Sequence, residues 1–234
     1  MFDSDKCIAI IPARGGSKRV KDKNISIVAG RPLIEHTINI AKEAKLFSQI
    51  FVNSESEKIL NLSLSCGVNI YRRSKDLSTD GSSVIEVVQD MIKSIPIDDD
   101  AIIYILLPTS PLRTLQDLVN MHKEYIKKSN KTVVSVTRFD TPIQLAQFVK
   151  NGKLMPVFEE EYSLSTKSTG HTEAYKFNEC AVVNSAKGFM SQNNLIGFNS
   201  TPYIMPPERS ITIDYPYQKD LVERMFEINK QNDC

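Results

Sequence analysis

The sequence lacks three features that would place it in other classes of protein. Its 29 Lys and Arg balance 28 Asp and Glu to a formal charge of +1, whereas a generic nucleic-acid-binding domain is usually markedly basic. No apolar run approaches the ~20 residues that a helix needs to cross a membrane. The four cysteines lie far apart without a CxxC pair, so we expect neither a zinc site nor a disulfide framework.

These absences also bear on where the protein works. The first residues, MFDSDKCIAII, enter a short apolar stretch after two acids, which is not the pattern of a secretory signal. A chain of 234 residues can bury a large core without disulfides or a structural metal. We therefore expect a cytoplasmic protein that has neither nucleic acid nor a membrane as its partner.

Short apolar runs alternate with amphipathic segments over the first 137 residues. The runs predict buried strands at Cys7–Ile11, Ser48–Val52, Val68–Tyr71, Ala101–Leu107 and Thr132–Thr137. The amphipathic segments predict helices at Pro32–Lys45, Ser56–Ser65, Ser82–Lys93 and Thr114–Lys128. Strands and helices that alternate at this spacing form βαβ units. We expect an α/β fold with a mostly parallel sheet flanked by helices.

The alternation of apolar runs and amphipathic segments stops after Arg138. Residues 139–180 contain turn residues, the acid run Glu159–Glu161 and a Ser/Thr cluster, and we interpret them as an excursion from the sheet that forms a lid, a dimer arm or both. Returning strands are expected at Ala181–Asn184, Thr201–Met205 and Ile211–Asp214, and a last helix at Tyr217–Lys230. Residues 1–234 are expected to form one domain into which the excursion is inserted.

The loop after the first strand, Ile11–Asn24, carries the strongest functional signal. Five cations fall within ten residues of it, at Arg14, Lys18, Arg19, Lys21 and Lys23. Gly15 and Gly16 let backbone N–H groups converge on an anion, and ligands of open α/β sheets bind at the carboxyl ends of the strands. We interpret this loop as a polyphosphate site; the alternative is a solvated loop whose lysines serve solubility. It has neither GxxxxGK[ST] nor GxGxxG, which argues against a Walker-type NTPase and an oxidoreductase.

Two further segments are candidates for ligand contact. In LLPTSPLR, Leu106–Arg113, the hydroxyls of Thr109 and Ser110 either contact a ligand or cap the next helix. Asp214, in SITID, is either a ligand for Mg²⁺ or a turn and capping aspartate. His36 and His122 lie within amphipathic helices and are expected to be structural or exposed, whereas His171 lies in the excursion and could contact substrate.

Together, IPARGGSKRVKDKNI, GRPLIEHTI, RRSKDLSTDGSS and LLPTSPLR resemble the acylneuraminate cytidylyltransferase family, the CMP-sialic acid synthetases and their relatives. The resemblance runs from about Ile8 to Asp220. It implies a Rossmann-like domain of the nucleotide-diphospho-sugar transferase type, which converts CTP and a nonulosonic acid to a CMP-sugar and pyrophosphate with Mg²⁺. It also implies a homodimer in which residues 139–180 are the dimerisation arm and help to shape the sugar pocket.

The resemblance also implies roles for individual residues. Arg14, Lys18 and Asp214 are the expected catalytic residues, with Asp214 as the metal ligand. Contacts with the nucleotide are expected from Ala13, Arg14, Gly15, Gly16, Ser17, Lys18, Lys23, Asn24, Arg73, Ser82 and Ser83. Contacts with the sugar are expected from Leu107, Pro108, Thr109, Ser110 and Arg113.

This sequence departs from the family pattern at three positions. Leu107 stands where the family often has a glutamine that meets the sugar, Thr212 stands where the first aspartate of an IDID signature would be, and Glu179 replaces a glycine. Leu107 points to a less polar or differently substituted acid, such as a pseudaminic, legionaminic or eight-carbon ulosonic acid. Thr212 leaves open a module that binds CTP without catalysis.

Overall fold

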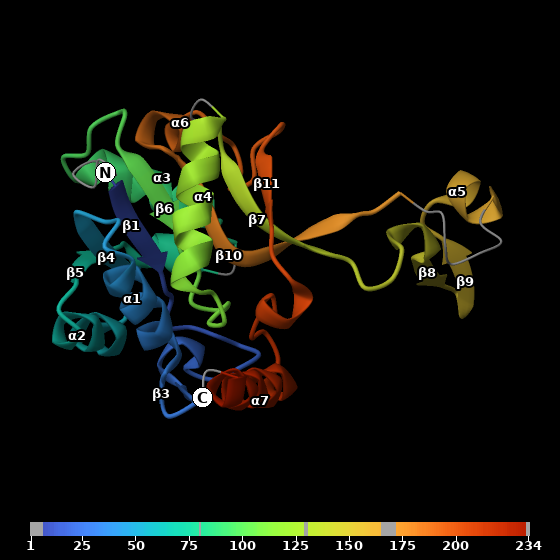
Figure 1. The fold of residues 1–234 in the computed structure, drawn as a ribbon, viewed down its shortest axis with the longest axis horizontal. Helices are drawn as coiled ribbons and strands as arrows, with labels where there is room; N and C mark the ends of the chain where they lie inside the picture. Colours follow the sequence, from blue (N-terminus) through green and yellow to red (C-terminus); the bar gives the residue numbers. More distant parts are fainter. Residues whose placement is uncertain (1–6, 80, 129–130, 165–171, 233–234) are drawn as a thin grey trace.

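The computed structural model describes residues 7–79, 81–128, 131–164 and 172–232, and its centre is a twisted sheet (Figure 1). Within these residues the sheet has seven strands, in the spatial order β11 (Thr201–Ile204), β7 (Val133–Arg138), β10 (Tyr175–Ser185), β6 (Ile102–Ile105), β1 (Cys7–Pro12), β4 (Gln49–Ser54) and β5 (Asn69–Arg72). The strands β6, β1, β4 and β5 run parallel, β10 is antiparallel to both of its neighbours, and β11 is parallel to β7. The prediction of a mostly parallel sheet is confirmed.

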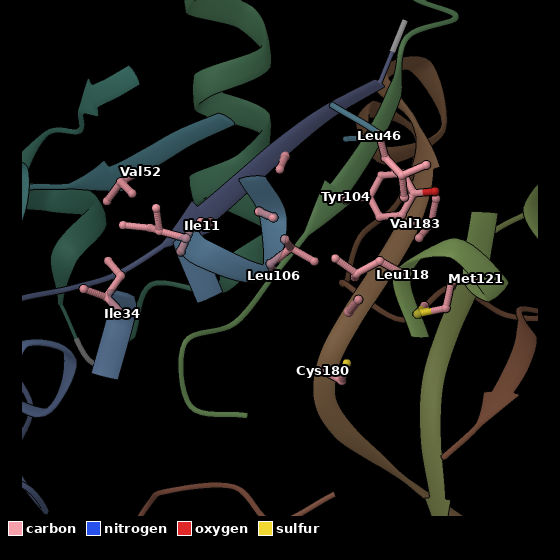
Figure 2. Packing of buried hydrophobic residues seen from close by; sticks show 14 of the residues in the cluster. Ile11, Ile34, Leu46, Val52, Tyr104, Leu106, Leu118, Met121, Cys180 and Val183 are labelled. Atoms are coloured by element: carbon pink, nitrogen blue, oxygen red, sulfur yellow. The ribbon is translucent and has the colours of Figure 1, made fainter. Parts of the chain in front are cut away.

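Helices cover both faces of the sheet. One core cluster joins the sheet to α1 (Leu33–Ala44), α2 (Glu57–Ser65) and α4 (Leu115–Lys127), and the other joins it to α3 (Val84–Ser94) and α6 (Ala186–Met190). Side chains of β1 alternate between them: Ala9 and Ile11 belong to the first cluster, Ile8 and Ile10 to the second. This explains why the strand is apolar on both faces. Figure 2 shows the first cluster, in which Ile34 of α1 and Leu118 of α4 lie over the sheet.

Of the two alternatives expected for the helical histidines, structural or exposed, the structure shows the first, because both rings are buried. His36 Nε2–H donates a hydrogen bond to the carbonyl of Val28 at 2.8 Å, and His122 Nδ1 is hydrogen-bonded to the hydroxyl of Tyr104 at 2.7 Å. Burial lowers the pKa of both rings, so the neutral imidazole is favoured at each position. His171 lies outside the described residues.

A third cluster anchors the C-terminal helix α7 (Pro216–Asn232). Val222 of α7 packs with Leu33, Leu112 and Ile213, beside the short hairpin of β2 (Ile27–Val28) and β3 (Arg31–Pro32). None of the helices in the described part of the chain is long and apolar enough to span a membrane. Short 3₁₀ turns occur at Lys23–Ile25, Lys75–Ser78, Ile143–Leu145 and Pro207–Arg209.

The expected excursion projects from the sheet (Figure 1). It carries a hairpin of β8 (Gln147–Lys150) and β9 (Lys153–Pro156), followed by α5 (Glu159–Leu164). The hairpin turns at Asn151 and Gly152, whose φ values of 53° and 72° suit a two-residue hairpin turn. We call residues 139–174 the arm, because the returning strand begins at Tyr175 instead of Ala181. The prediction put this strand too late because Glu179 interrupts its apolar pattern.

The expected strand at Ile211–Asp214 is wrong. This segment is a loop in which the N–H of Ile213 donates to the carbonyl of Thr109 at 2.8 Å. The alternation of Ile211, Thr212 and Ile213 reflects the anchoring of Ile213 beneath α7 instead of a place in the sheet. The other predicted helices and strands are present, with ends that shift by a few residues.

Candidate active site

A cavity of about 340 Å³ lies at the carboxyl edge of the parallel strands. Its walls come from the loops after β1, β5 and β6, from the start of α3, from β10 and from the loop before α7. The lining residues are Pro12, Arg14, Arg19, Lys23, Asn24, Arg73, Leu77, Thr79, Ser82, Val84, Val87, Leu107, Pro108, Thr109, Glu179 and Asp214. Nine of the predicted site residues are thus brought together from four distant segments: Arg14, Lys23, Asn24, Arg73, Ser82, Leu107, Pro108, Thr109 and Asp214.

The basic loop is held in place by its own side chains. Asn24 is buried and donates to the carbonyl of Arg14 at 2.9 Å, and Lys23 donates to the carbonyl of Ile213 at 2.9 Å and to Asp214 at 3.0 Å. Both residues line the cavity, yet these bonds also fix the loop. An adjoining cavity of about 260 Å³ is lined by Ser17 and Lys18 together with cations of the first cavity.

The backbone N–H of Gly15 was expected to face an anionic ligand, but it is bonded within the protein. Its N–H donates to Oε1 of Glu55 at 2.7 Å, so this donor already has an anionic partner within the protein. A Cβ at this position would lie 2.9 Å from the Cβ of Ser56, which explains why the closest approach requires glycine. Gly16 has open space around it. Ala13 is buried in the core and does not line the cavity, because its N–H continues the sheet toward Asn53 at 2.9 Å.

Arg73 is fixed by the same carboxylate. Its Nε and Nη2 donate to Oε2 of Glu55 at 3.1 and 2.9 Å, and its side chain is 5% exposed. Burial favours a higher pKa for the Glu55 carboxyl, but hydrogen bonds from Gly15 and Arg73 outweigh it and lower the pKa. Glu55 therefore holds a charged arginine at the edge of the cavity. Sequence reasoning missed Glu55, although it follows β4 at the edge where ligand groups gather.

The two adjacent serines at the start of α3 have different roles. Ser83 is the N-cap of α3. Its N–H donates to the carboxylate of Glu86 at 2.8 Å, and the N–H of Glu86 donates to the Ser83 hydroxyl, which together form a capping box. Ser82 lines the cavity and bonds the carbonyl of Asp76 at 3.1 Å. Ser82 therefore lines the cavity, whereas the Ser83 hydroxyl caps the helix; a contact of either with a nucleotide stays a prediction.

In the turn after β6, too, some of the predicted contact residues line the cavity and others are buried beneath it. Thr109 lines the cavity, whereas Ser110 and Arg113 are buried, so the last two are not placed for a sugar contact. The guanidinium of Arg113 donates to the carbonyl of Leu107 and to Thr37, which shapes the turn from below. Neither hydroxyl of the turn caps α4, because Thr114 does so with Asp117 in a capping box.

Asp214, in the loop before α7, lines the cavity beside two cationic side chains. Its Oδ1 is 3.0 Å from Lys23 Nζ and 3.1 Å from Arg19 Nη2, and the Arg19 guanidinium stacks over Tyr215 at 5.1 Å. A hydrogen bond with Tyr215 and the charge of Asp214 raise the pKa of Arg19. The Asp214 carboxylate is a hard oxygen donor that fits Mg²⁺, since this ion commonly takes one or two carboxylates and completes its shell with phosphates and water. No group of three potential metal ligands occurs among the described residues.

Glu179 adds a second carboxylate to the cavity. Thr109 Oγ1 donates to its Oε2 at 2.6 Å. The sequence showed that a glutamate replaces glycine here but gave it no role. Leu77 and Thr79 were also missed as lining residues, because their contribution depends on how the loops fold back over the sheet edge. Arg19 was counted among the cations of the polyphosphate loop but received no individual contact.

Comparisons with known proteins show the family of this chain. The family model described as "Cytidylyltransferase" matches residues 8–227. The chain is 27% identical over 230 residues to a pseudaminic acid cytidylyltransferase of Campylobacter jejuni, with 97% of this chain and 99% of that protein covered. It is 30% identical over 236 residues to a CMP-N,N'-diacetyllegionaminic acid synthase of Legionella pneumophila, with 97% and 98% covered.

Solved structures show the same fold at low identity. A CMP:2-keto-3-deoxy-manno-octonic acid synthetase complexed with CTP superposes with a TM-score of 0.68 at 12% identity, over 96% of this chain and 99% of that one. A 4-diphosphocytidyl-2C-methyl-D-erythritol synthase gives 0.68 at 12% identity, over 94% and 98%. The Rossmann-like fold expected from the motifs is thereby confirmed. The chain is a nucleotidyltransferase and belongs to the cytidylyltransferase family.

Proposed function

We propose that this protein transfers CMP from CTP to the anomeric hydroxyl of a nonulosonic acid and releases pyrophosphate. The observation that carries this proposal is the cavity at the sheet edge, where Arg14, Arg19, Lys23 and Arg73 line one space with the carboxylate of Asp214. A concentrated cationic wall in a chain of net charge +1 suits a small polyanion such as CTP. The family supports the same nucleotide.

The proposed reaction is a direct displacement at phosphorus. The anomeric oxygen forms a bond to the α-phosphorus, the bond from that phosphorus to the bridging oxygen breaks, and pyrophosphate leaves with the electron pair. The proton of the attacking hydroxyl passes to solvent. Such a reaction depends mainly on positioning and on neutralisation of charge. Arg14 and Lys18 stabilise the charge of the triphosphate, and Arg73, fixed by Glu55, faces the nucleotide.

Mg²⁺ is the proposed cofactor, with Asp214 as the protein ligand. When bound, the ion supplies charge neutralisation at the phosphates and acidifies the attacking hydroxyl. Lys23 and Arg19 hold the Asp214 carboxylate at 3.0 and 3.1 Å. These contacts orient the carboxylate toward the cavity that it lines.

The arm supports a homodimer. Four apolar side chains of its hairpin are exposed, with Phe148 at 60%, Val149 at 76%, Leu154 at 66% and Met155 at 41%. Exposed apolar surface of this kind commonly marks an interface. We propose that a second copy of the chain covers the hairpin, and that the protein works in the cytoplasm, where thiols such as those of Cys7, Cys66 and Cys180 stay reduced.

The acid is proposed to be of the pseudaminic or legionaminic kind. Leu107 lines the cavity at the position where the family often has a glutamine that meets the sugar. The two relatives named for such acids match this chain over 99% and 98% of their own length.

Pyrophosphate release tests the reaction. The purified protein is assayed with CTP, Mg²⁺ and, in separate reactions, pseudaminic, legionaminic, N-acetylneuraminic and eight-carbon ulosonic acids; UTP in place of CTP is the nucleotide control. We expect CTP-dependent turnover with a pseudaminic- or legionaminic-type acid. Tight binding of CTP without pyrophosphate from any acid would contradict the proposal and favour a module that binds CTP without catalysis.

A further inference from the structure

Glu179 has a backbone conformation that residues with a side chain seldom adopt. Its φ of 59° lies in the left-handed region, within β10, where the register against β7 breaks between Phe177 and Val182. Glycine adopts this conformation freely, whereas a Cβ makes it unfavourable. Strained positions of this kind persist where the surrounding structure enforces them, and they cluster at functional sites.

The neighbours of Glu179 enforce the conformation. Asn178 is buried and donates to Ser210 Oγ at 2.9 Å, and the N–H of buried Cys180 donates to Asn178 Oδ1 at 3.3 Å. These bonds hold the break in register without using the side chain of Glu179. A glycine would satisfy the backbone at this position, so the need for a glutamate must come from its carboxylate.

Within the described part of the chain, one hydrogen-bond donor orients the carboxylate of Glu179. Thr109 Oγ1 donates to Oε2 at 2.6 Å, while Oε1 accepts no hydrogen bond from the described residues. The carbonyl of Thr109 also accepts the N–H of Ile213 at 2.8 Å, so the loop that carries Asp214 meets the same threonine. Asp214 is paired with Lys23 and Arg19 at 3.0 and 3.1 Å. Glu179 has no such ion pair with a described residue, although its charge contributes to the raised pKa of Arg19.

The strand order places Glu179 at one end of the cavity. Along the sheet, the order β10, β6, β1, β4, β5 arranges the lining groups as Glu179, then Leu107 and Thr109, then Arg14, and finally Arg73. Arg14 and Arg73 mark the other end of this row, which is the proposed site of CTP, while Arg19 and Lys23 line the same cavity beside Asp214. The end with Leu107, Thr109 and Glu179 is therefore left for the acceptor.

Charge decides what the carboxylate can bind. The phosphates of CTP and the carboxylate of the sugar acid are anions, which Glu179 repels at short range. A carboxylate with a free oxygen instead accepts strong hydrogen bonds from neutral donors. We propose that Glu179 is a specificity-determining residue, whose carboxylate accepts a hydrogen bond from a hydroxyl or amide N–H group of the acceptor acid. This inference rests on the proposed function.

Steady-state kinetics of Glu179→Gln and Glu179→Gly test the inference. With the acid that the wild type uses, we expect the KM for the acid to rise at least tenfold in both variants, and the KM for CTP to stay within twofold. Glu227→Gln, on the exposed face of α7, is the matched control and leaves both constants unchanged. An unchanged KM for the acid in both Glu179 variants would overturn the inference.

Thermal unfolding separates recognition from a structural role. The Tm of Glu179→Gly is expected to equal or exceed that of the wild type, because relief of the left-handed backbone offsets the lost hydrogen bond from Thr109. A Tm lowered by more than ~4 °C together with an unchanged KM for the acid would show that Glu179 is structural. Binding of Mn²⁺, followed by electron paramagnetic resonance, is expected to match the wild type in Glu179→Gln; weaker binding would make Glu179 a metal ligand and overturn the inference.

The same assays distinguish failure of the inference from failure of the proposed function. If the wild type turns over an acid and the KM for that acid is unchanged in the Glu179 variants, only the role of Glu179 is contradicted. If the wild type turns over no acid, the proposed function fails. Calorimetric titration of the same four acids into protein loaded with a non-hydrolysable CTP analogue then decides the inference: wild-type binding that weakens at least tenfold in Glu179→Gln supports it, and equal or absent binding overturns it.

Discussion

Glu55 binds Arg73 through two hydrogen bonds, at 3.1 Å to Nε and 2.9 Å to Nη2. Its other oxygen accepts the N–H of Gly15 at 2.7 Å. One carboxylate therefore connects the loop after β1 to the segment after β5, which are 58 positions apart between Gly15 and Arg73. Because Arg73 lines the cavity, Glu55 is a positioning residue for the proposed nucleotide site.

Glu55→Gln is expected to raise the KM for CTP about tenfold and to lower the free energy of unfolding by about 2 kcal/mol. The amide keeps one acceptor but removes the charge that a buried guanidinium needs, and breaking such a pair is costly. The conservative variant Glu55→Asp is expected to recover part of the CTP affinity. Steady-state kinetics and urea unfolding measure both effects; the matched control is Glu57→Gln, an exposed residue of α2.

The stability that Glu55 contributes depends on pH. Burial favours a higher pKa, but the hydrogen bonds from Gly15 and Arg73 outweigh it, so the folded pKa lies below its ordinary value of 4.5. The contribution is present above pH 4.5 and is lost as the pH falls through the lowered value. The stability difference between the wild type and Glu55→Gln should therefore shrink from pH 6 to pH 3 in urea titrations. A difference that stays constant over this range would contradict the assigned pKa shift.

Much of the fold followed from local pattern, whereas the details of the site did not. The run CIAII predicted a buried strand because its side chains supply both cores, Ala9 to one and Ile10 to the other. The loop after it was identified by its charge density. Glu55 and Glu179 were missed because their roles arise from contacts with Arg73 and Thr109, which lie 18 and 70 positions away. The supposed strand at Ile211–Asp214 failed because α7, not a sheet partner, buries Ile213.

Arg14→Ala is expected to remove at least ~2 kcal/mol of transition-state stabilisation, which lowers kcat/KM about thirtyfold. Arg14 lines both cavities of the basic loop, where it can neutralise charge that develops on the triphosphate. Arg224→Ala, with 80% of its side chain exposed on α7, is the control. CTP-dependent turnover of Arg14→Ala at the wild-type rate would contradict the catalytic assignment of this residue.

Asp214→Asn is expected to raise the Mg²⁺ concentration for half-maximal turnover at least tenfold. The amide retains an oxygen but loses the charge that favours a hard divalent cation. Weaker Mn²⁺ binding in electron paramagnetic resonance titrations provides a readout that is independent of turnover. Asp220→Asn, on exposed α7, controls for a general change in surface charge; equal metal dependence in the two variants would argue against Asp214 as the ligand.

The double substitution Val149→Asp with Leu154→Asp is expected to convert the proposed dimer to monomers at micromolar concentration. The two residues are cross-strand partners on the arm hairpin and are 76% and 66% exposed, so the single chain has no core there to lose. Buried carboxylates at an interface repel each other and lose hydration without a partner. Sedimentation equilibrium measures the change, with Leu64→Asp, on α2 and 52% exposed, as the control. A wild type that sediments as a monomer, or a variant that still dimerises, would show that the arm does not join two copies.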